Sequence, residues 1–223
     1  MKQKLLIIIL LSLITKYGNA QFFDQYGLNM GASYSNQLWD YKLISIDNSN
    51  KDYKIGLSFF LSAEKKINKI FSIRPEIGYT QKGFKDNIKI ITFSDGTSAG
   101  IDKENVTFHN LILNIGFKIT PFDYKFSPYA IWGFRGNYMF SYKDITFEEP
   151  GSGLKFNMYK SIIEEFDKFN LGGLIGIGVE LNDITYFEIE YNPPITSSFN
   201  DSSLEIKDNG WGFKLGIYIN KLI

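Results

Sequence analysis

Apolar and polar residues alternate along most of the chain beyond residue 25. The alternation is most regular in residues 71–80, where odd positions carry apolar or aromatic side chains and even positions carry polar residues or glycine. Because successive side chains of a β-strand point to opposite faces, this pattern predicts a strand with one apolar face. Similar segments recur, so the sequence predicts an all-β fold. The eight predicted strands cover about residues 25–38, 53–64, 71–83, 110–119, 126–140, 170–180, 187–192 and 211–220.

The connections between these strands alternate strictly between short and long. The short ones are residues 65–69, 120–125 and 182–183, and the long ones are residues 39–52, 85–104, 141–168 and 193–208. Outer-membrane barrels have short turns on the periplasmic side and long loops outside, whereas a soluble sandwich has no reason to sort its loops by side. We therefore predict an eight-stranded antiparallel up-and-down transmembrane β-barrel. An even number of strands closes such a sheet and removes its edges.

Residues 1–20 have the order of a secretory signal peptide. Two lysines precede an apolar run that is too short to span a bilayer, and small residues stand before a cleavage site after Ala20. The alternative is an N-terminal anchor that is not cleaved. We expect cleavage before Gln21, export to the outer membrane of a Gram-negative bacterium, and one barrel domain over residues 21–223.

Composition narrows the classes of function. Lys and Arg together number 24, as do Asp and Glu, so the net charge is zero. The chain therefore has no overall positive charge that would attract nucleic acid. The sequence has no cysteine, which excludes disulfides, thiolate metal sites and a cysteine nucleophile. Aromatic residues make up 17 % of the chain, and strands and membrane interfaces both favour them. We expect no metal ion, no cofactor and no nucleic-acid partner.

The strand sequences resemble one known family. The segments that carry the resemblance are residues 56–83 (notably Phe71-Ser72-Ile73-Arg74-Pro75-Glu76-Ile77-Gly78-Tyr79-Thr80-Gln81-Lys82-Gly83), 111–118, Ser127-Pro128-Tyr129, 172–180 and Glu188-Ile189-Glu190-Tyr191. The chain is similar in these segments, and over nearly all of residues 21–223, to the PorT-like outer-membrane β-barrel proteins of Bacteroidetes. The resemblance implies a barrel architecture and, for some members, a role in secretion or gliding machinery.

Charged residues recur on the polar faces of the strands, which face the lumen of the predicted barrel. They are Lys54, Arg74, Glu76, Lys118, Arg135, Glu180, Glu188, Glu190 and Lys214. One interpretation is a pathway for ions or substrates. The other is a plug of ion pairs, because a buried charge needs a partner and the lumen of an eight-stranded barrel is only wide enough for its own side chains. The mixed signs favour the plug.

Three further features have a structural and a functional interpretation. Glu188 and Glu190 share a strand face, as acid–base carboxylates do, but the lysines and arginines on that face favour neutralisation. His109 is the only histidine, and alternation places it on the outward face near the external rim. Residues 159–166 predict a short amphipathic helix in the third long loop, either a lid or binding element or an ordered loop.

Three functions are compatible with these features. The first is a non-enzymatic barrel that binds a partner or stabilises the envelope. The second is a narrow pore, and the third is an enzyme at the external rim, for which no set of nucleophile, base and orienting group is recognisable. We expect contact with outer-membrane lipid, insertion by the barrel assembly machinery, and a protein partner bound through the external loops.

Overall fold

The structure is a computed structural model that describes residues 22–42, 51–86, 90–92, 96, 98–100, 105–122, 124–148 and 153–221. The predicted signal peptide and its cleavage site lie outside the described residues, so both stay predictions. None of the helices in the described ranges is long and apolar enough to cross a membrane.

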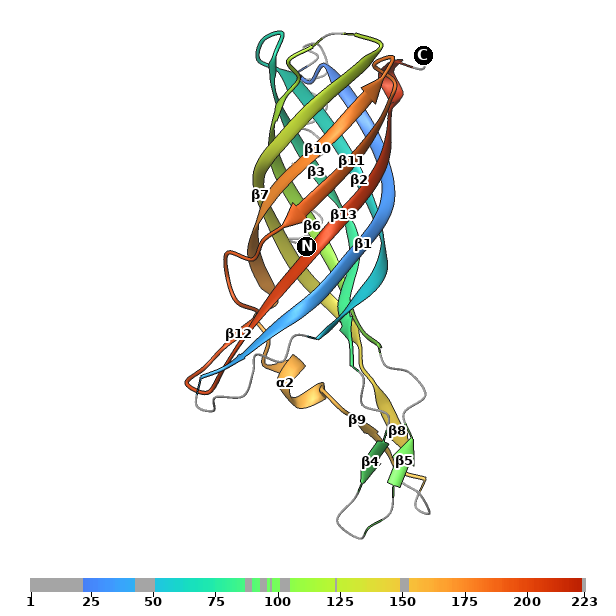
Figure 1. Ribbon diagram of the computed structural model, residues 1–223, viewed down its shortest axis with the longest axis vertical. Coiled ribbons are helices and arrows are strands. Elements are labelled where there is room, and N and C mark those ends of the chain that lie inside the picture. The colour runs from blue at the N-terminus through green and yellow to red at the C-terminus, as the bar shows by residue number, and fades with distance from the viewer. Residues whose placement is uncertain are drawn as a thin grey trace, which may run out of the picture.

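Eight long strands of the described chain form a closed antiparallel ring, as the alternation predicts (Figure 1). Each strand pairs with the next one in the series, and the last pairs with the first, from Gly27 opposite Tyr218 to Tyr41 opposite Leu204. The eight strands are, in order, β1 (Gln25–Tyr41), β2 (Asp52–Lys66), β3 (Phe71–Lys85), β6 (Asn105–Ile119), β7 (Phe126–Lys143), β10 (Phe169–Leu181), β11 (Thr185–Asn192) and β13 (Leu204–Tyr218).

The connections are sorted by end, as predicted. The turns between β2 and β3, β6 and β7, and β10 and β11 lie at one end of the barrel, at the top of Figure 1. In the tightest of these turns Asn182 and Asp183 adopt positive φ angles of 53° and 57°, which Asn and Asp tolerate better than most residues. The remaining elements are β4 (Ile90–Thr92), β5 (Ser98–Gly100), β8 (Thr146–Glu148), β9 (Lys155–Asn157), α2 (Lys160–Glu164), β12 (Phe199–Asn200) and the 3₁₀ turn η1 (Ile219–Lys221).

Several strands are longer at the loop end than the sequence pattern predicts. β13 begins at Leu204, so residues 204–208, which we expected in the fourth long loop, are strand. They remain paired with β1, and two of their side chains, Leu204 and Ile206, are buried in an apolar cluster. The composition of this segment is typical of a loop, and the inward face of the strand is apolar instead of polar. The sequence pattern therefore did not indicate a strand here.

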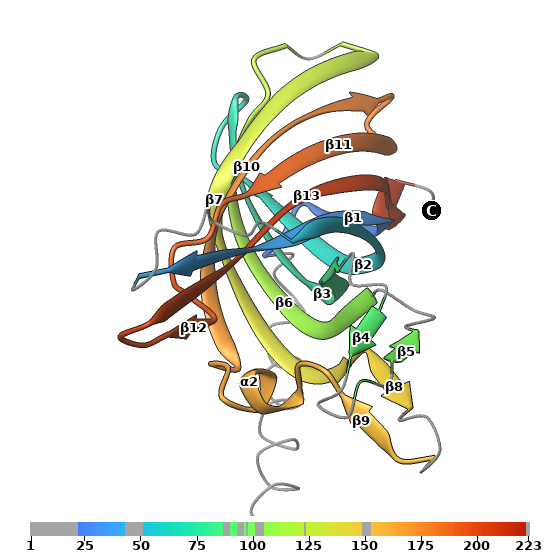
Figure 2. The same ribbon diagram turned by 60° about the horizontal axis from the view of Figure 1, so that its bottom comes forward.

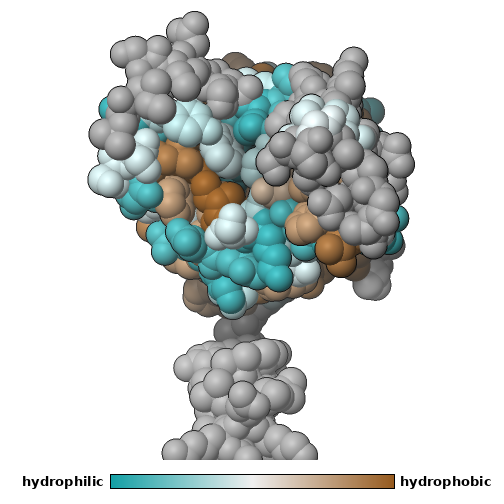
Figure 3. Space-filling view, turned by 90° about the horizontal axis from the view of Figure 1, so that it is seen from below, coloured by the Kyte–Doolittle hydropathy of each residue, from teal (hydrophilic) through white to brown (hydrophobic). Residues whose placement is uncertain are grey.

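That apolar cluster, which we call the mouth cluster, fills the loop end of the barrel. Its buried members are Trp39, Phe84, Val106, Phe108, Ile145, Tyr159, Ile163, Phe166, Leu204 and Ile206. The predicted helix is present as α2 at the loop end (Figure 2). Its residue Ile163 is 2 % exposed. Seen from the loop end, hydrophobic side chains gather between hydrophilic ones (Figure 3). The ends of the strands and the loops therefore close the mouth with a small shared hydrophobic core.

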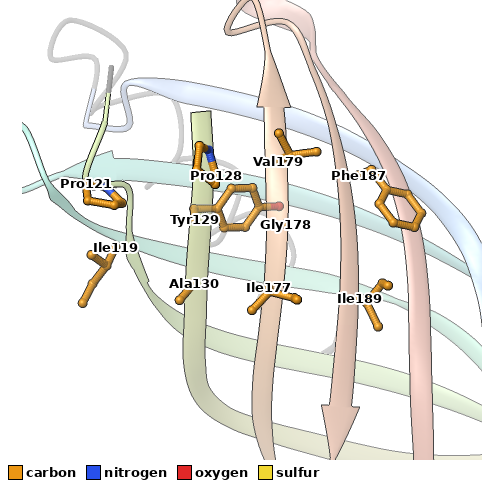
Figure 4. A pocket seen from close by; sticks show the side chains of 10 residues that line it. All are labelled: Ile119, Pro121, Pro128, Tyr129, Ala130, Ile177, Gly178, Val179, Phe187 and Ile189. Carbon is orange, nitrogen blue, oxygen red and sulfur yellow. The ribbon is translucent and has the colours of Figure 1, made fainter. Parts of the chain in front are cut away.

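The outward face of the ring is a continuous apolar wall. Ile77 on β3 is 49 % exposed, whereas its neighbour Glu76 is 2 % exposed. A shallow apolar depression of about 560 Å³ crosses the wall over β7, β10 and β11, where Ala130 and Gly178 lie among larger residues (Figure 4). An exposed apolar surface of this extent is expected on a barrel surrounded by lipid.

Aromatic residues follow the outer wall toward the loop end. Tyr79 Oη lies 2.6 Å from His109 Nδ1, and both rings lie beside that of Phe140. His109 is half-buried on the outward face, where alternation placed it. Tyr34 stacks on Tyr53 with 4.4 Å between ring centroids. Such aromatic rings are typical of the boundary between hydrocarbon and water.

Candidate functional site

The lumen holds a network of buried ion pairs. Within the membrane-spanning part its most exposed charged member, Glu180, is only 7 % exposed. The strands bring these side chains together because every second residue of each strand points inward and the ring is narrow.

The part of the network nearest the short turns is centred on Lys118 of β6. Lys118 Nζ donates to Glu64 Oε2 at 2.9 Å and to Glu180 Oε1 at 2.5 Å. Tyr218 Oη lies within hydrogen-bond distance of both carboxylates, at 2.9 and 2.7 Å. Ser72 donates to the other oxygen of Glu64 at 2.7 Å. A single ammonium thus bridges two carboxylates, and hydroxyl groups supply further hydrogen-bond partners.

The central part of the network joins β3, β11 and β13. Arg74 Nη2 donates to Glu188, and Arg74 Nε lies 3.3 Å from Glu76 Oε1. Lys214 Nζ donates to Glu76 at 2.6 Å and to Glu190 at 2.5 Å, and it lies 3.7 Å from Glu188. In the ring of eight strands β3 and β11 stand opposite each other, so the pair of Arg74 and Glu188 spans the lumen.

The part nearest the loops is centred on Arg135 of β7. Its Nε donates to Asn114 Oδ1 at 2.9 Å, its Nη1 donates to Asn192, and its Nη2 lies 3.5 Å from Glu190. Asn114 in turn donates to Glu76 at 2.8 Å, which links this part to the central one. Tyr129 joins the Lys118 part to the central one, because its Oη donates to Glu188 at 2.7 Å and its ring lies beside Lys118 Nζ. The network is therefore continuous across the lumen.

Aromatic rings fill the remaining interior space. Lys214 Nζ lies 4.4 Å from the centroid of Phe60, and Lys118 Nζ lies 4.7 Å from that of Tyr129. Tyr129 covers Gly178 on the neighbouring strand so closely that a Cβ there would lie 2.3 Å from the ring. Small residues under large ones let the side chains pack closely in the narrow lumen. Two internal cavities of about 20 and 10 Å³ lie between the network and the loops, and each is of the size of a single water molecule.

Eight of the nine charged residues predicted to face the lumen lie in this network. Lys54 is also inward and buried, but it lies nearer the loops, and no ion pair joins it to a carboxylate of the described ranges. Glu64 was not among the predicted lumen residues, although it has the same parity as Lys54 on β2, because it falls at the predicted end of that strand. The asparagine and tyrosine partners also follow the parity of their strands, but a neutral polar residue does not by itself indicate that it belongs to an ion-pair network.

Above the network, Tyr159 of the mouth cluster forms a separate polar site with Asp86 and Asp144. Tyr159 donates to Asp86 Oδ2, and its backbone N–H donates to Asp144 Oδ2 at 2.9 Å. Burial and the hydrogen bond to Asp86 raise the pKa of Tyr159 well above its ordinary value. Burial also raises the pKa of Asp144, although backbone N–H groups partly oppose this shift. These contacts fix the start of α2 over the mouth.

No set of three or more His, Cys, Asp or Glu side chains in the described ranges is arranged to hold a metal ion. The network can neutralise charge and rigidify the barrel, and its groups are paired with one another. Of its charged members, Glu64 and Glu180 also line a polar pocket of about 450 Å³ at the short-turn end.

No curated protein matches its sequence. Solved structures with a similar fold include the attachment invasion locus protein Ail of Yersinia pestis (13 % identity, 87 % of this chain and 98 % of that one, TM-score 0.41). They also include the outer membrane protein OprG of Pseudomonas aeruginosa (10 % identity, 88 % and 96 %, TM-score 0.49) and Neisserial surface protein A (13 % identity, 86 % and 96 %, TM-score 0.41). Similarities at this level carry no argument about function.

The family comparison is more informative because it covers almost the whole chain. The model of the outer membrane protein beta-barrel domain matches residues 6–220. The closed eight-stranded ring and its apolar outer wall agree with this match. The chain therefore belongs to the outer membrane protein beta-barrel domain family.

Proposed function

We propose that this protein is a non-enzymatic component of the outer membrane that binds a partner or supports the envelope through its external end, and that its lumen transports no solute. The observation that carries the proposal is the continuous ion-pair network of the lumen, with the mouth cluster above it. Lipid covers the outward apolar wall in this proposal, and the barrel assembly machinery inserts the chain.

The energetics of the network oppose the alternative of a narrow pore. A solute pathway through the lumen would have to separate pairs such as Arg74 with Glu188 and Lys214 with Glu76. Removing one partner of a buried ion pair costs about 3–5 kcal/mol, because the remaining charge is left without compensation. Several such pairs would have to open together, and the mouth cluster would have to unpack as well.

Liposome swelling tests the transport half of this proposal. Liposomes that contain the purified, folded protein are diluted into an isotonic solution of a small sugar, and the decrease in light scattering is followed. We expect the swelling rate of protein-free liposomes. Swelling that rises with the amount of protein would contradict the proposal and favour the pore.

The external end is the part we propose to bind a partner. Its described surface combines α2, the hairpins β4–β5 and β8–β9, and exposed apolar side chains such as Leu154 and Phe156. Photo-crosslinking from position 156 in intact cells, compared with position 126 at the short-turn end, tests this. We expect one discrete adduct from position 156 only, and equal patterns from both positions would contradict the assignment.

Two narrower parts of the proposal rest on the sequence alone. Export through a cleaved signal peptide predicts that the protein from envelopes begins at Gln21, and mass spectrometry that finds residues 1–20 still attached would refute it. The resemblance to PorT-like proteins adds a link to secretion or gliding machinery. Deletion of the gene should then impair protein secretion or surface motility, and wild-type behaviour in both assays would remove this link.

A further inference from the structure

One side chain of the external mouth lies inside a box of aromatic rings. Lys51 Nζ is 4.9 Å from the ring centroid of Trp39, 5.3 Å from that of Tyr159 and 5.8 Å from that of Phe84. All three rings are buried members of the mouth cluster. An ammonium within about 6 Å of an aromatic face is attracted by the negative charge of that face.

The three rings stand as walls at steep angles to one another. The planes of Phe84 and Tyr159 meet at 84°, those of Trp39 and Phe84 at 75°, and those of Trp39 and Tyr159 at 67°. The rings come from β1, β3 and the start of α2, so the fold assembles the box from three separate segments. We call this box, with Asp86, the aromatic cage.

A carboxylate completes the cage. Lys51 Nζ donates to Asp86 Oδ2 at 2.6 Å and to Tyr159 Oη at 3.2 Å. Aromatic walls with one carboxylate are the surroundings that bind alkylammonium groups, because the rings attract the charge without hydrating it and the carboxylate neutralises it. The cage is therefore built for an ammonium group, whether that group is tethered to this chain or not.

The position of Lys51 makes it an exchangeable occupant. Its backbone N–H donates to Gln37 O at 3.1 Å, which anchors the residue to β1, while only its long side chain enters the cage. That side chain is 15 % exposed and the Asp86 side chain is 12 % exposed, so the ion pair in the cage is not sealed from solvent. A lysine stem can leave such a site by rotation of its own bonds, without movement of a strand.

We propose that the external mouth contains a binding site for an alkylammonium group, which Lys51 occupies in the closed state and from which an external ammonium ligand displaces it. This inference rests on the proposed function, since it names the chemistry that the external end would bind. Displacement of Lys51 removes one of the contacts that hold Tyr159 and α2 over the mouth. The ligand group is the lysine side chain of a protein partner, as the proposed function implies, and an amine of a lipid headgroup is the alternative outcome of the test.

The tethered ammonium sets the concentration at which a free one competes. A group on a short flexible tether acts at an effective concentration in about the millimolar range, so a single free ammonium displaces Lys51 only at about millimolar concentration. Removal of the Lys51 side chain empties the cage and lets a small ammonium ligand bind without competition. This difference provides the test.

The first experiment uses Trp39 as the reporter. Trp132 and Trp211 lie on the outer wall, and Trp132→Phe and Trp211→Phe leave Trp39 as the single tryptophan. In this background we compare Lys51 with Lys51→Ala in detergent and titrate choline against its uncharged analogue 3,3-dimethylbutan-1-ol. We expect Lys51→Ala to bind choline at least about tenfold more tightly than the analogue. Equal responses to the two compounds would overturn the proposal.

Asp86→Asn in the same Lys51→Ala background is the matched control. It should weaken choline binding while leaving the response to the uncharged analogue unchanged. The same loss for both compounds would show that the cavity is merely apolar and would overturn the ammonium assignment.

The second experiment needs no change at Lys51, so it stands even if Lys51→Ala does not fold. The single-tryptophan protein with Lys51 intact is titrated with glycerophosphoethanolamine and, separately, with a peptide that carries one lysine. We expect a saturable change of Trp39 fluorescence in about the millimolar range, and the compound that produces it identifies the source of the ammonium. No change with either compound would overturn the exchange, whereas the swelling result would still decide the proposed function separately.

Discussion

Arg74 on β3 and Glu188 on β11 form an ion pair between strands that stand opposite each other in the ring. Both side chains have no exposed surface. A buried pair of this kind is most costly when only one partner is removed, because the other charge then has no compensation. The pair therefore ties two opposite walls of the barrel together and predicts a distinct pattern of stability.

Arg74→Met should destabilise the folded barrel by about 3–5 kcal/mol, because Glu188 and Glu76 both lose a partner. The double variant Arg74→Met with Glu188→Gln should recover part of that loss. Urea titrations in lipid vesicles, read as the folded band on an unheated gel, measure both. As a control, Lys160→Met breaks the exposed pair with Glu164 and should cost no more than about 0.5 kcal/mol. Equal losses for Arg74→Met and Lys160→Met would contradict the buried network.

The outer wall gives a second prediction. Ile77→Arg places a charge in hydrocarbon, at a cost of about 2–4 kcal/mol near the bilayer midplane. Asn200→Arg, at the exposed end of β12, is the control, because it adds the same side chain in water. We expect a lower folded fraction for Ile77→Arg in lipid vesicles and a smaller difference in detergent, where the micelle deforms around a charge. Equal folding of the two variants in lipid would show that residue 77 does not face lipid.

Close packing inside the lumen gives a third prediction. A Cβ on Gly216 would lie 2.2 Å from the Tyr186 ring, so Gly216→Ala should lower the folded yield. Gly136→Ala is the matched control, because its Cβ would meet the Phe169 ring at an ordinary 3.4 Å. The yield of heat-modifiable protein after refolding into vesicles measures the difference. A tolerated Gly216→Ala would mean that the Tyr186 side chain does not fill the lumen at this point.

The fourth prediction concerns the turn between β12 and β13 at low pH. Asp201 accepts backbone N–H bonds from Ser203 at 2.6 Å and Leu204 at 2.7 Å, and these bonds lower the pKa of Asp201 below its ordinary 3.8. Because the folded pKa is depressed, the turn is fully stabilised above pH 3.8 and loses this stabilisation as the pH falls further. Protection of the Leu204 amide from hydrogen exchange should decrease there. Asp201→Asn keeps an acceptor that does not titrate, so a decrease that persists in this variant would exclude Asp201 as its cause.

Much of the fold was predictable because the two faces of a membrane barrel obey one simple rule. The outward position of Ile77 and the inward position of Glu76 follow directly from the alternation of apolar and polar residues. The loop lengths then give the orientation of every strand. The loop end was predicted less well. Residues such as Leu204 and Ile206 are apolar but point inward, which reverses the rule where the strands leave the membrane and pack against the mouth cluster.

The candidate site was predictable in its charges but not in its pairing. The inward parity of Arg74 and Glu188 follows from their strands, whereas their partnership depends on which strands stand opposite each other in the closed ring. The aromatic cage around Lys51 had no signal in the sequence. Its rings come from three distant segments, and only the folded loops bring Trp39 and Tyr159 together.

The central claim is that the lumen is closed by its own side chains. Single-channel recording in a planar bilayer tests it most directly, with purified protein whose folding is verified by its mobility on an unheated gel. We predict a baseline without conductance steps in symmetrical salt at neutral pH, because the ion pairs around Lys118, Arg74 and Arg135 leave no continuous path for water or ions. A steady, reproducible open-channel current that scales with the amount of folded protein would contradict the closed lumen.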